Sequence, residues 1–277
     1  MAGGAGEAAG TRWDPGIYER YKSYRDRPAL DLMVRIPNDL KPLHIWDLGC
    51  GTGEHAAVLK RRHPAARVHG LDSSPEMLAQ ARARPDEVDW VLGDIAAFAP
   101  EWPSDLIFTN AALHWLPDHA RLYPRLVEAL APGGVFACQV PMTYESAWHE
   151  AMREAAADGP WAPLMAEVQG VTRLQTAETY YDWLAPLCSE VDIWSTVYLH
   201  ALQGADPVVD WMRGTGLRPY LQALEGSDQE AAFLDAYRAR LASLFPIRPD
   251  GVTLLPFPRM FIVARRWSGL PLSARPG

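Results

Sequence analysis

Three glycines packed into five positions are the strongest chemical signal in the sequence. The segment from His44 to Glu54 reads HIWDLGCGTGE, and apolar positions at helical spacing follow it. Glycine takes positive φ readily and lacks a Cβ, so the amides of Gly49, Gly51 and Gly53 can approach a small molecule closely. The pattern predicts a buried strand, a tight ligand-binding loop and the start of a helix.

The spacing of the glycines separates two classes of ligand. Nicotinamide-dependent enzymes carry G-x-G-x-x-G, whereas the three glycines here follow G-x-G-x-G after an acidic residue, Asp47. The shorter spacing resembles the S-adenosyl-L-methionine (SAM) loop of class I methyltransferases. SAM carries an ammonium group where a dinucleotide carries phosphates, and a carboxylate at the loop entrance suits that charge. We therefore expect this cofactor to contact Asp47, Gly49, Cys50, Gly51 and Gly53.

A second carboxylate follows the loop at the distance expected for a ribose-binding residue. Residues 67–72 predict a second strand that ends at Asp72, about 20 residues beyond the loop, where doubly wound folds bind ribose hydroxyls. Ser73 and Met77 are further candidates for contacts with the cofactor. Met77 also fits a core position on the next helix, so both readings stay open.

A third carboxylate lies behind the next expected strand, at residues 88–92. Ligands of open α/β sheets bind outside the carboxyl ends of the strands. Asp94 is therefore placed to accept a hydrogen bond from the adenine amino group, with Ile95 against the ring.

The segment behind the fourth expected strand, residues 104–110, should pass beneath the methyl donor. Asn110, Ala111 and Trp115 are therefore further candidates for cofactor binding. His114 is the candidate for a general base, although a histidine between leucine and tryptophan is more often a structural residue.

Strand and helix patterns alternate regularly through the first half of the chain. Five strand-helix units before residue 142 predict a parallel sheet with right-handed crossovers. A sixth strand is expected at 190–200 and a last one at 260–265, after a hairpin that Gly251 opens. The prediction is an α/β, doubly wound, mostly parallel seven-stranded sheet of the Rossmann-like class, with an antiparallel C-terminal strand.

Local signals predict how some helices begin. Ser74 should cap one helix with Pro75 at its first position, and Asp118 should cap another. Pro28 should begin a fresh helix, because proline in a helix interior removes a hydrogen bond.

Composition divides the chain further. Residues 1–11 are rich in glycine and alanine and predict a disordered extension, whereas residues 12–266 form the expected catalytic domain. Within it, 142–188 and 201–250 predict helical insertions that form a substrate lid. Residues 267–277 predict a flexible tail.

Charge and hydropathy favour a small-molecule substrate. The 277 residues carry a formal net charge of −8 with no basic run, which argues against a nucleic-acid partner. The sequence shows neither a membrane-spanning run nor a signal peptide, so we expect a cytoplasmic protein and a monomer. Its three cysteines have no metal-binding spacing, and no metal is expected.

Several longer stretches resemble one family, the trans-aconitate 2-methyltransferases, over residues 12–266. The glycine loop and Asp72 are shared by many SAM enzymes and specify only the cofactor. The more specific stretches lie outside the cofactor fold. The stretches that carry the resemblance are Trp13-Asp14-Pro15 with Tyr18, Arg25-Asp-Arg27-Pro28, Asn110 to Asp118, Glu190 to Trp194, Asp210-Trp211, Thr215 to Pro219 and Phe257 to Arg266. Residues 148–174 depart most from the family pattern, and Ser195 replaces a residue that is often basic.

The resemblance implies methyl transfer from SAM to a carboxylate of trans-aconitate or a similar polyacid, with S-adenosyl-L-homocysteine as the second product. A carboxylate has a pKa of about 4 and is already an anionic nucleophile at neutral pH, so no general base is required. Guanidinium groups would hold the other carboxylates. The candidates for substrate binding are Arg27, Arg218 and Arg259, with Arg173 weaker, and the hydroxyls of Tyr18 and Tyr144. We expect at least two of the first three arginines in one pocket near the SAM sulfur.

Three alternatives stay open. A class I enzyme that methylates a hydroxyl or a carbon of another metabolite would need His114 as its base. A SAM-binding protein without catalysis would bind the cofactor and methylate no acid. A nicotinamide oxidoreductase fits less well, because the third glycine comes one residue early.

Overall fold

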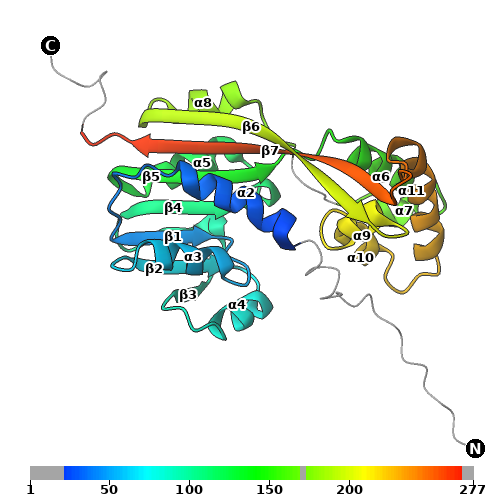
Figure 1. Cartoon of the computed structure of the whole chain (residues 1–277), viewed down its shortest axis with the longest axis horizontal. Helices are drawn as coiled ribbons and strands as arrows, with labels where there is room; N and C mark the ends of the chain where they lie inside the picture. The colour runs from blue at the N-terminus through cyan, green and yellow to red at the C-terminus, as the bar shows by residue number, and fades with distance from the viewer. Residues whose placement is uncertain (1–21, 169–172, 270–277) are drawn as a thin grey trace, which may run out of the picture. The chain divides into compact units, whose positions relative to one another are not determined.

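The computed structural model describes residues 22–168 and 173–269, which form two compact units. The sheet unit contains residues 26–142, 173–197 and 258–269. The helical unit contains residues 22–25, 143–168 and 198–257. The two long strands β6 and β7 contribute residues to both units, as the ribbon in Figure 1 shows.

A seven-stranded sheet in the order β3-β2-β1-β4-β5-β7-β6 is the core of the sheet unit. The pairs formed by β1 to β5 are parallel, whereas β7 runs antiparallel to β5. The strands are β1 (His44–Leu48), β2 (Arg67–Asp72), β3 (Asp89–Leu92), β4 (Ser104–Asn110), β5 (Leu130–Pro141), β6 (Cys188–Gln203) and β7 (Val252–Arg266). The predicted fold class is confirmed, including the antiparallel last strand.

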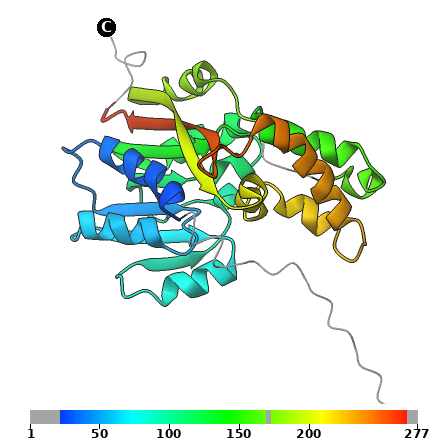
Figure 2. The same cartoon turned by 45° about the vertical axis from the view of Figure 1, so that its right-hand side comes forward.

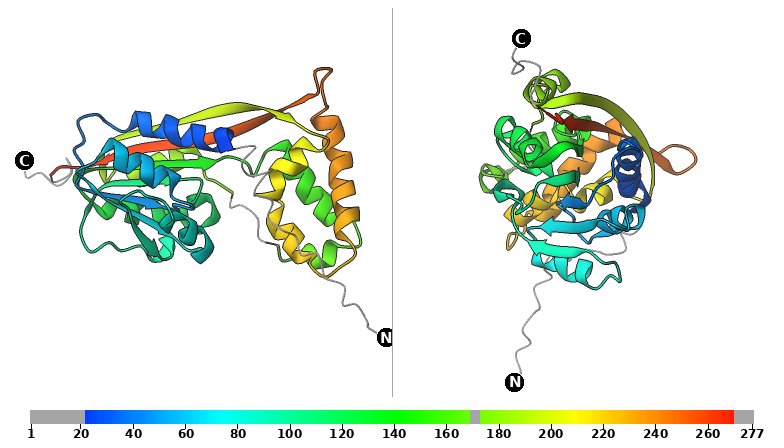
Figure 3. Two further views of the ribbon diagram at one scale, coloured as in Figure 1. Left: turned by 60° about the horizontal axis from the view of Figure 1, so that its bottom comes forward. Right: turned by 90° about the vertical axis from the view of Figure 1, so that its left-hand side faces the viewer.

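Helices cover both faces of the sheet. In Figures 2 and 3, α2 and α3 lie on one face, and α5 and α8 lie on the other. The helices that accompany the sheet are α2 (Lys22–Arg35), α3 (Glu54–Arg62), α4 (Pro75–Arg82), α5 (His119–Glu128) and α8 (Ala177–Leu184), with short 3-10 helices η1 (Ile95–Ala97) and η2 (Leu113–Trp115). Apolar side chains from α5 and α8 meet those of β4, β5 and β7 in one buried cluster. This cluster makes the sheet a rigid platform for the loops at its edge.

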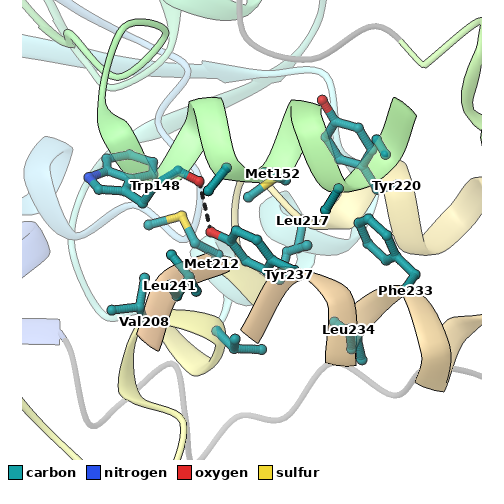
Figure 4. Close-up of a cluster of buried hydrophobic side chains, with 14 of the residues drawn as sticks. Trp148, Met152, Val208, Met212, Leu217, Tyr220, Phe233, Leu234, Tyr237 and Leu241 are labelled. Atoms are coloured by element: carbon teal, nitrogen blue, oxygen red, sulfur yellow. Dashed lines mark hydrogen bonds between the residues drawn. The ribbon is translucent and has the colours of Figure 1, made fainter. Parts of the chain in front are cut away.

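The helical unit has a hydrophobic core of its own, drawn in Figure 4. Its helices are α6 (Ala147–Ala157), α7 (Ala162–Met165), α9 (Pro207–Arg213), α10 (Arg218–Ala223) and α11 (Glu230–Leu244). Helices α6 and α11 are joined by a hydrogen bond from the Tyr237 hydroxyl to the Trp148 carbonyl, at 3.0 Å. The expected helical segment 142–188 is thus divided, because α6 and α7 belong to this unit and α8 belongs to the sheet unit.

The expectation that Pro28 begins a new helix is wrong. Helix α2 runs through it without a break, although proline has no N–H to donate. The residues that follow, Ala29, Leu32 and Met33, are at most 3% exposed. Burial of this apolar face outweighs the missing hydrogen bond, and tertiary packing commonly overrides local propensity in this way.

The two helix caps turn out differently. The Ser74 hydroxyl accepts a hydrogen bond from the Met77 N–H at 3.2 Å, with Pro75 at the first helical position, so this cap is confirmed. Asp118 stands at the start of α5, but its side chain makes no capping bond. Its φ of 53° is left-handed, whereas capping side chains reach the helix from an extended backbone.

Candidate active site

The three glycines of the loop between β1 and α3 all have positive φ, from 54° to 83°. A Cβ on Gly49 would lie 2.3 Å from the Ala112 Cβ, and a Cβ on Gly53 would lie 2.4 Å from the Trp90 ring. Both glycines are therefore required by packing inside the protein. A Cβ on Gly51 would meet no described atom within 4 Å. Gly51 is the position where the loop faces open space, which suits a ligand.

Asp72 connects this loop to the end of β2. Its carboxylate accepts hydrogen bonds from the Gly51 N–H at 2.8 Å and from the Ser74 N–H at 2.9 Å. Two carboxylate oxygens provide about four acceptor positions, so Asp72 retains capacity for two further hydroxyl donors. This arrangement fits the ribose role expected of Asp72.

Asp94 lies at the same edge of the sheet as Asp72. The Gly93 N–H donates to the Asp72 carbonyl at 3.0 Å, which holds the end of β3 beside the end of β2. The exposed Asp94 side chain accepts a hydrogen bond from the Ala96 N–H at 2.8 Å and thereby begins η1. Arg125 supports η1 from α5 by donating to the Ile95 carbonyl at 2.9 Å.

The remaining candidates for contacts with the cofactor differ in how deeply they are buried. Ile95 is buried, and its Cδ1 would lie 3.5 Å from a Cβ on Gly49. Met77 is half-buried at the start of α4, and Ser73 is exposed. Cys50 is buried, and its burial raises the pKa of the thiol far above its ordinary value, so the group stays a neutral thiol.

Asp47 is a buried carboxyl group at the loop entrance, with 1% of its surface exposed. Burial, together with the nearby Asp72 and Glu54 carboxylates, raises its pKa to about 8, against the lowering effect of a hydrogen bond from the Ala56 N–H. Among the described residues, its Oδ2 has no hydrogen-bond partner. A buried acceptor without a donor fits the ammonium group of SAM, which would supply both a hydrogen bond and a compensating charge.

SAM should bind more tightly as the pH rises from about 5.5 to about 7, a range in which its ammonium stays charged. The free protein holds a proton on Asp47 up to a pH of about 8, whereas an ammonium beside the carboxyl lowers its pKa. Binding therefore releases a proton, and affinity should gain up to about tenfold per pH unit in this range.

Isothermal titration calorimetry in buffers of different ionisation enthalpy measures both the affinity and the released proton. Asp47→Asn should remove the pH dependence, because the amide cannot ionise. A wild-type affinity that stays constant across this range would show that Asp47 does not meet the ammonium.

The end of β4 carries the next group of candidates. Ala111 has a φ of 53°, unusual for a residue with a Cβ, and its N–H donates to the Gln139 carbonyl at 2.9 Å. The Asn110 Oδ1 is buried and has no hydrogen-bond partner among the described residues. His114 is 4% exposed with its ring 4.7 Å from that of Trp115, which is 44% exposed. Asn110 thus offers an unused acceptor at the ligand edge.

The candidates for substrate binding are spread over both units. Arg259 is 4% exposed and its Nη1 donates to Gln139 Oε1 at 3.2 Å. The Arg27 side chain is 71% exposed and lies 3.8 Å from Asp31 on the same helix. Arg259 is thus buried, whereas Arg27 is largely exposed. The expectation that at least two of the three arginines share one pocket stays a prediction.

In the helical unit, Arg218 is exposed, and Tyr144 has the Arg153 guanidinium 4.4 Å from its ring. Arg173, in the sheet unit, is exposed. Tyr18 lies outside the described residues.

Two residues at this site were not singled out from the sequence. The Trp90 ring packs where a Cβ on Gly53 or on Gly70 would be, so it supports the loop from below. Gln139 partners Arg259 from the middle of an apolar strand. The sequence signal for Gln139 was a glutamine within an apolar strand. No local pattern in the sequence identified Trp90 as a support of the loop.

Class I methyltransferases combine this strand order with a glycine loop of this spacing, and the sequence matches the family described as Methyltransferase domain over residues 45–134. Solved structures agree in fold. The YcgJ protein of Bacillus subtilis has a TM-score of 0.56 at 15% identity, with 88% of this chain and 100% of that one covered. Phosphoethanolamine N-methyltransferase 2 of Haemonchus contortus has a TM-score of 0.53 at 16% identity, with 87% and 52% covered.

Curated relatives match nearly end to end. The trans-aconitate 2-methyltransferase of Methylobacterium radiotolerans is 47% identical over 259 residues, which cover 92% of this chain and 99% of the relative. That of Azoarcus sp. is 46% identical over 254 residues, with the same coverage. The chain belongs to the trans-aconitate 2-methyltransferase family, and its cofactor is SAM.

The described part of the chain contains neither a membrane-spanning helix nor a cluster of metal-binding side chains. No helix there is long and apolar enough to cross a membrane. Within the same residues, histidine, cysteine and acidic side chains do not gather in groups of three or more that could bind a metal ion.

Proposed function

We propose that this protein transfers the methyl group of SAM to a carboxylate of trans-aconitate and releases a monomethyl ester and S-adenosyl-L-homocysteine. The observation that carries the proposal is the match along nearly the full length to relatives named for this reaction. The buried guanidinium of Arg259 supports it, because a polyanionic substrate needs a fixed cation.

The chemistry asks mainly for placement. Bound SAM would supply a methyl group on a positively charged sulfur, and an ionised carboxylate of the substrate would accept this group without a general base. In the proposed arrangement, Asp47 would contact the ammonium group of the cofactor. Asp72 would accept hydrogen bonds from the ribose hydroxyls, and Asp94 would accept one from the adenine amino group. Holding the oxygen, carbon and sulfur in line can contribute about 7–11 kcal/mol to lowering the barrier.

The remaining parts of the proposal concern the rest of the chain. We propose that the helical segments in 142–188 and 201–250 cover the substrate, and that residues 1–11 and 267–277 are dispensable for transfer. The proposed protein is a cytoplasmic monomer with neither a nucleic-acid nor a membrane partner. Trimming the chain to residues 12–266 and measuring its turnover would test whether the two end segments are dispensable. Its mass in solution would test whether the protein is a monomer.

Incubation with SAM and a panel of acids tests the reaction itself. The panel contains trans-aconitate, cis-aconitate, isocitrate and citrate, and mass spectrometry reports the addition of one methyl group. The proposal expects trans-aconitate to be the best acceptor. SAM binding without transfer to any acid would instead favour a non-catalytic SAM-binding protein.

His114→Gln should leave the turnover of trans-aconitate within about threefold of the wild type, because an ionised carboxylate needs no base. The buried position of His114 beside the Trp115 ring suits a packing role. Steady-state kcat with saturating SAM is the measurement. A loss of kcat of about 100-fold or more with unchanged SAM affinity would favour the rival enzyme that methylates a hydroxyl or a carbon.

A further inference from the structure

Gln139 is a fully buried amide whose orientation is set by its neighbour. Its Oε1 accepts a hydrogen bond from Arg259 Nη1 at 3.2 Å. A guanidinium can only donate, so the amide oxygen must face Arg259 and the NH₂ group must point away from it. Among the described residues, this Nε2 has no hydrogen-bond partner, and the side chain is 0% exposed. A buried NH₂ group in this state calls for an acceptor that the described residues do not supply.

Strand register places Gln139 at the edge where ligands bind. It lies opposite Asn110, which is at the carboxyl end of β4. Arg259, on the neighbouring strand β7, lies opposite Pro141 of β5. Side chains in register on adjacent strands share a face, and so do residues two apart on one strand. Gln139, Arg259 and Asn110 therefore lie on the face that carries Asp47, which is in register with Phe108.

An amide at this position also preserves the charge of Arg259. A glutamate there would form an ion pair with the guanidinium and neutralise it. Glutamine instead holds the guanidinium through a neutral oxygen, so the two side chains together keep a net positive charge. The pair thus combines one buried cation with one buried NH₂ donor, a combination suited to a carboxylate.

We propose that Gln139 and Arg259 form a single carboxylate-binding pair, in which Gln139 both positions the guanidinium and donates its own N–H to a ligand oxygen. The inference rests on the proposed function, because that function supplies the acid. Two ligands present the same chemistry, namely the polyacid substrate and the methionine carboxylate of SAM. The KM for trans-aconitate and the Kd for SAM, measured in variants of Gln139, distinguish these two ligands.

The variants Gln139→Glu and Gln139→Met change the amide and keep its length. If the pair binds the substrate, the KM for trans-aconitate should rise about 10- to 100-fold, while the Kd for SAM stays unchanged. If it binds the cofactor carboxylate, the Kd for SAM should rise by that factor instead. A variant with wild-type melting temperature, wild-type KM and wild-type Kd for SAM would overturn the proposal.

Thr109→Val is the matched control. Thr109 precedes Asn110 on β4, is 0% exposed and also has a hydroxyl without a hydrogen-bond partner among the described residues, but it points to the opposite face. It tests whether loss of a buried polar group in this part of the sheet is enough to change KM. We expect both constants to stay at wild-type values.

Three dicarboxylic acids, itaconate, mesaconate and glutaconate, each lack one carboxylate of trans-aconitate. Substrate binding by the pair predicts that one of them loses its sensitivity to Gln139→Met, because the carboxylate that the pair holds is missing. Equal sensitivity for all three would reject the substrate form of the proposal. If the wild type methylates no acid, the proposed function fails, and calorimetry of SAM and of trans-aconitate with Gln139→Glu still tests the pair.

Discussion

Gly51→Ala should weaken SAM binding by about 100-fold, equivalent to about 2.8 kcal/mol, while the protein stays folded. The added Cβ meets no described protein atom, so it would enter the space beside the loop that we assign to the cofactor. The backbone φ of 54° costs alanine about 1 kcal/mol relative to glycine. The melting temperature should therefore fall by only about 2–4 °C. Calorimetry and thermal denaturation measure the two effects separately.

Gly226→Ala is the control for this prediction. Gly226 has a φ of 82° and also open space around an added Cβ, but it belongs to the helical unit rather than to the loop. Alanine there should cause a similar fall in melting temperature with unchanged SAM affinity. Wild-type SAM affinity in Gly51→Ala would show that the cofactor does not lie against this part of the loop.

Asp72→Asn should weaken SAM binding by about 100-fold as well. The carboxylate accepts two backbone N–H bonds and is proposed to accept two ribose hydroxyls. Hydrogen bonds to a charged acceptor are worth about 1.5–3 kcal/mol each, and an amide provides only one oxygen for these donors. Its NH₂ group would face the Gly51 or Ser74 N–H, so the loop itself should loosen. Titration calorimetry with SAM and with S-adenosyl-L-homocysteine should show equal losses, because both ligands carry the same ribose.

Asp89→Asn controls for the removal of a negative charge near the site. Asp89 lies on β3, is half exposed and pairs with Arg67 at 2.7 Å on the surface. Exposed ion pairs contribute about 0–1 kcal/mol, so this variant should bind SAM as the wild type does. Equal losses in both variants would show that net charge, rather than the geometry of Asp72, determines affinity.

Most of the sheet could be predicted from local patterns. The second, third and fourth strands begin and end within one residue of their expected bounds, because each is a short apolar run followed by a turn signal. The continuous apolar run of the fifth strand starts only at Val135, but the strand begins at Leu130, and the last strand was predicted from residue 260 but begins at Val252. These extensions contain Pro132, Gly133, Pro256 and Pro258, residues that argue against a strand locally. Pairing with distant parts of the chain decided their length.

The cofactor loop and its neighbouring acids are properties of the sequence alone. Positive φ favours glycine, and a carboxylate that ends a parallel strand lies at the ligand edge in any doubly wound sheet, so residue type and spacing were sufficient to predict where the loop and these acids lie. Tertiary structure decided which of three similar glycines faces open space, because only packing against Ala112 and Trp90 distinguishes them. It also decided that Arg259 meets Gln139, 120 residues earlier in the chain, since a contact between distant strands depends on register that local residues do not encode.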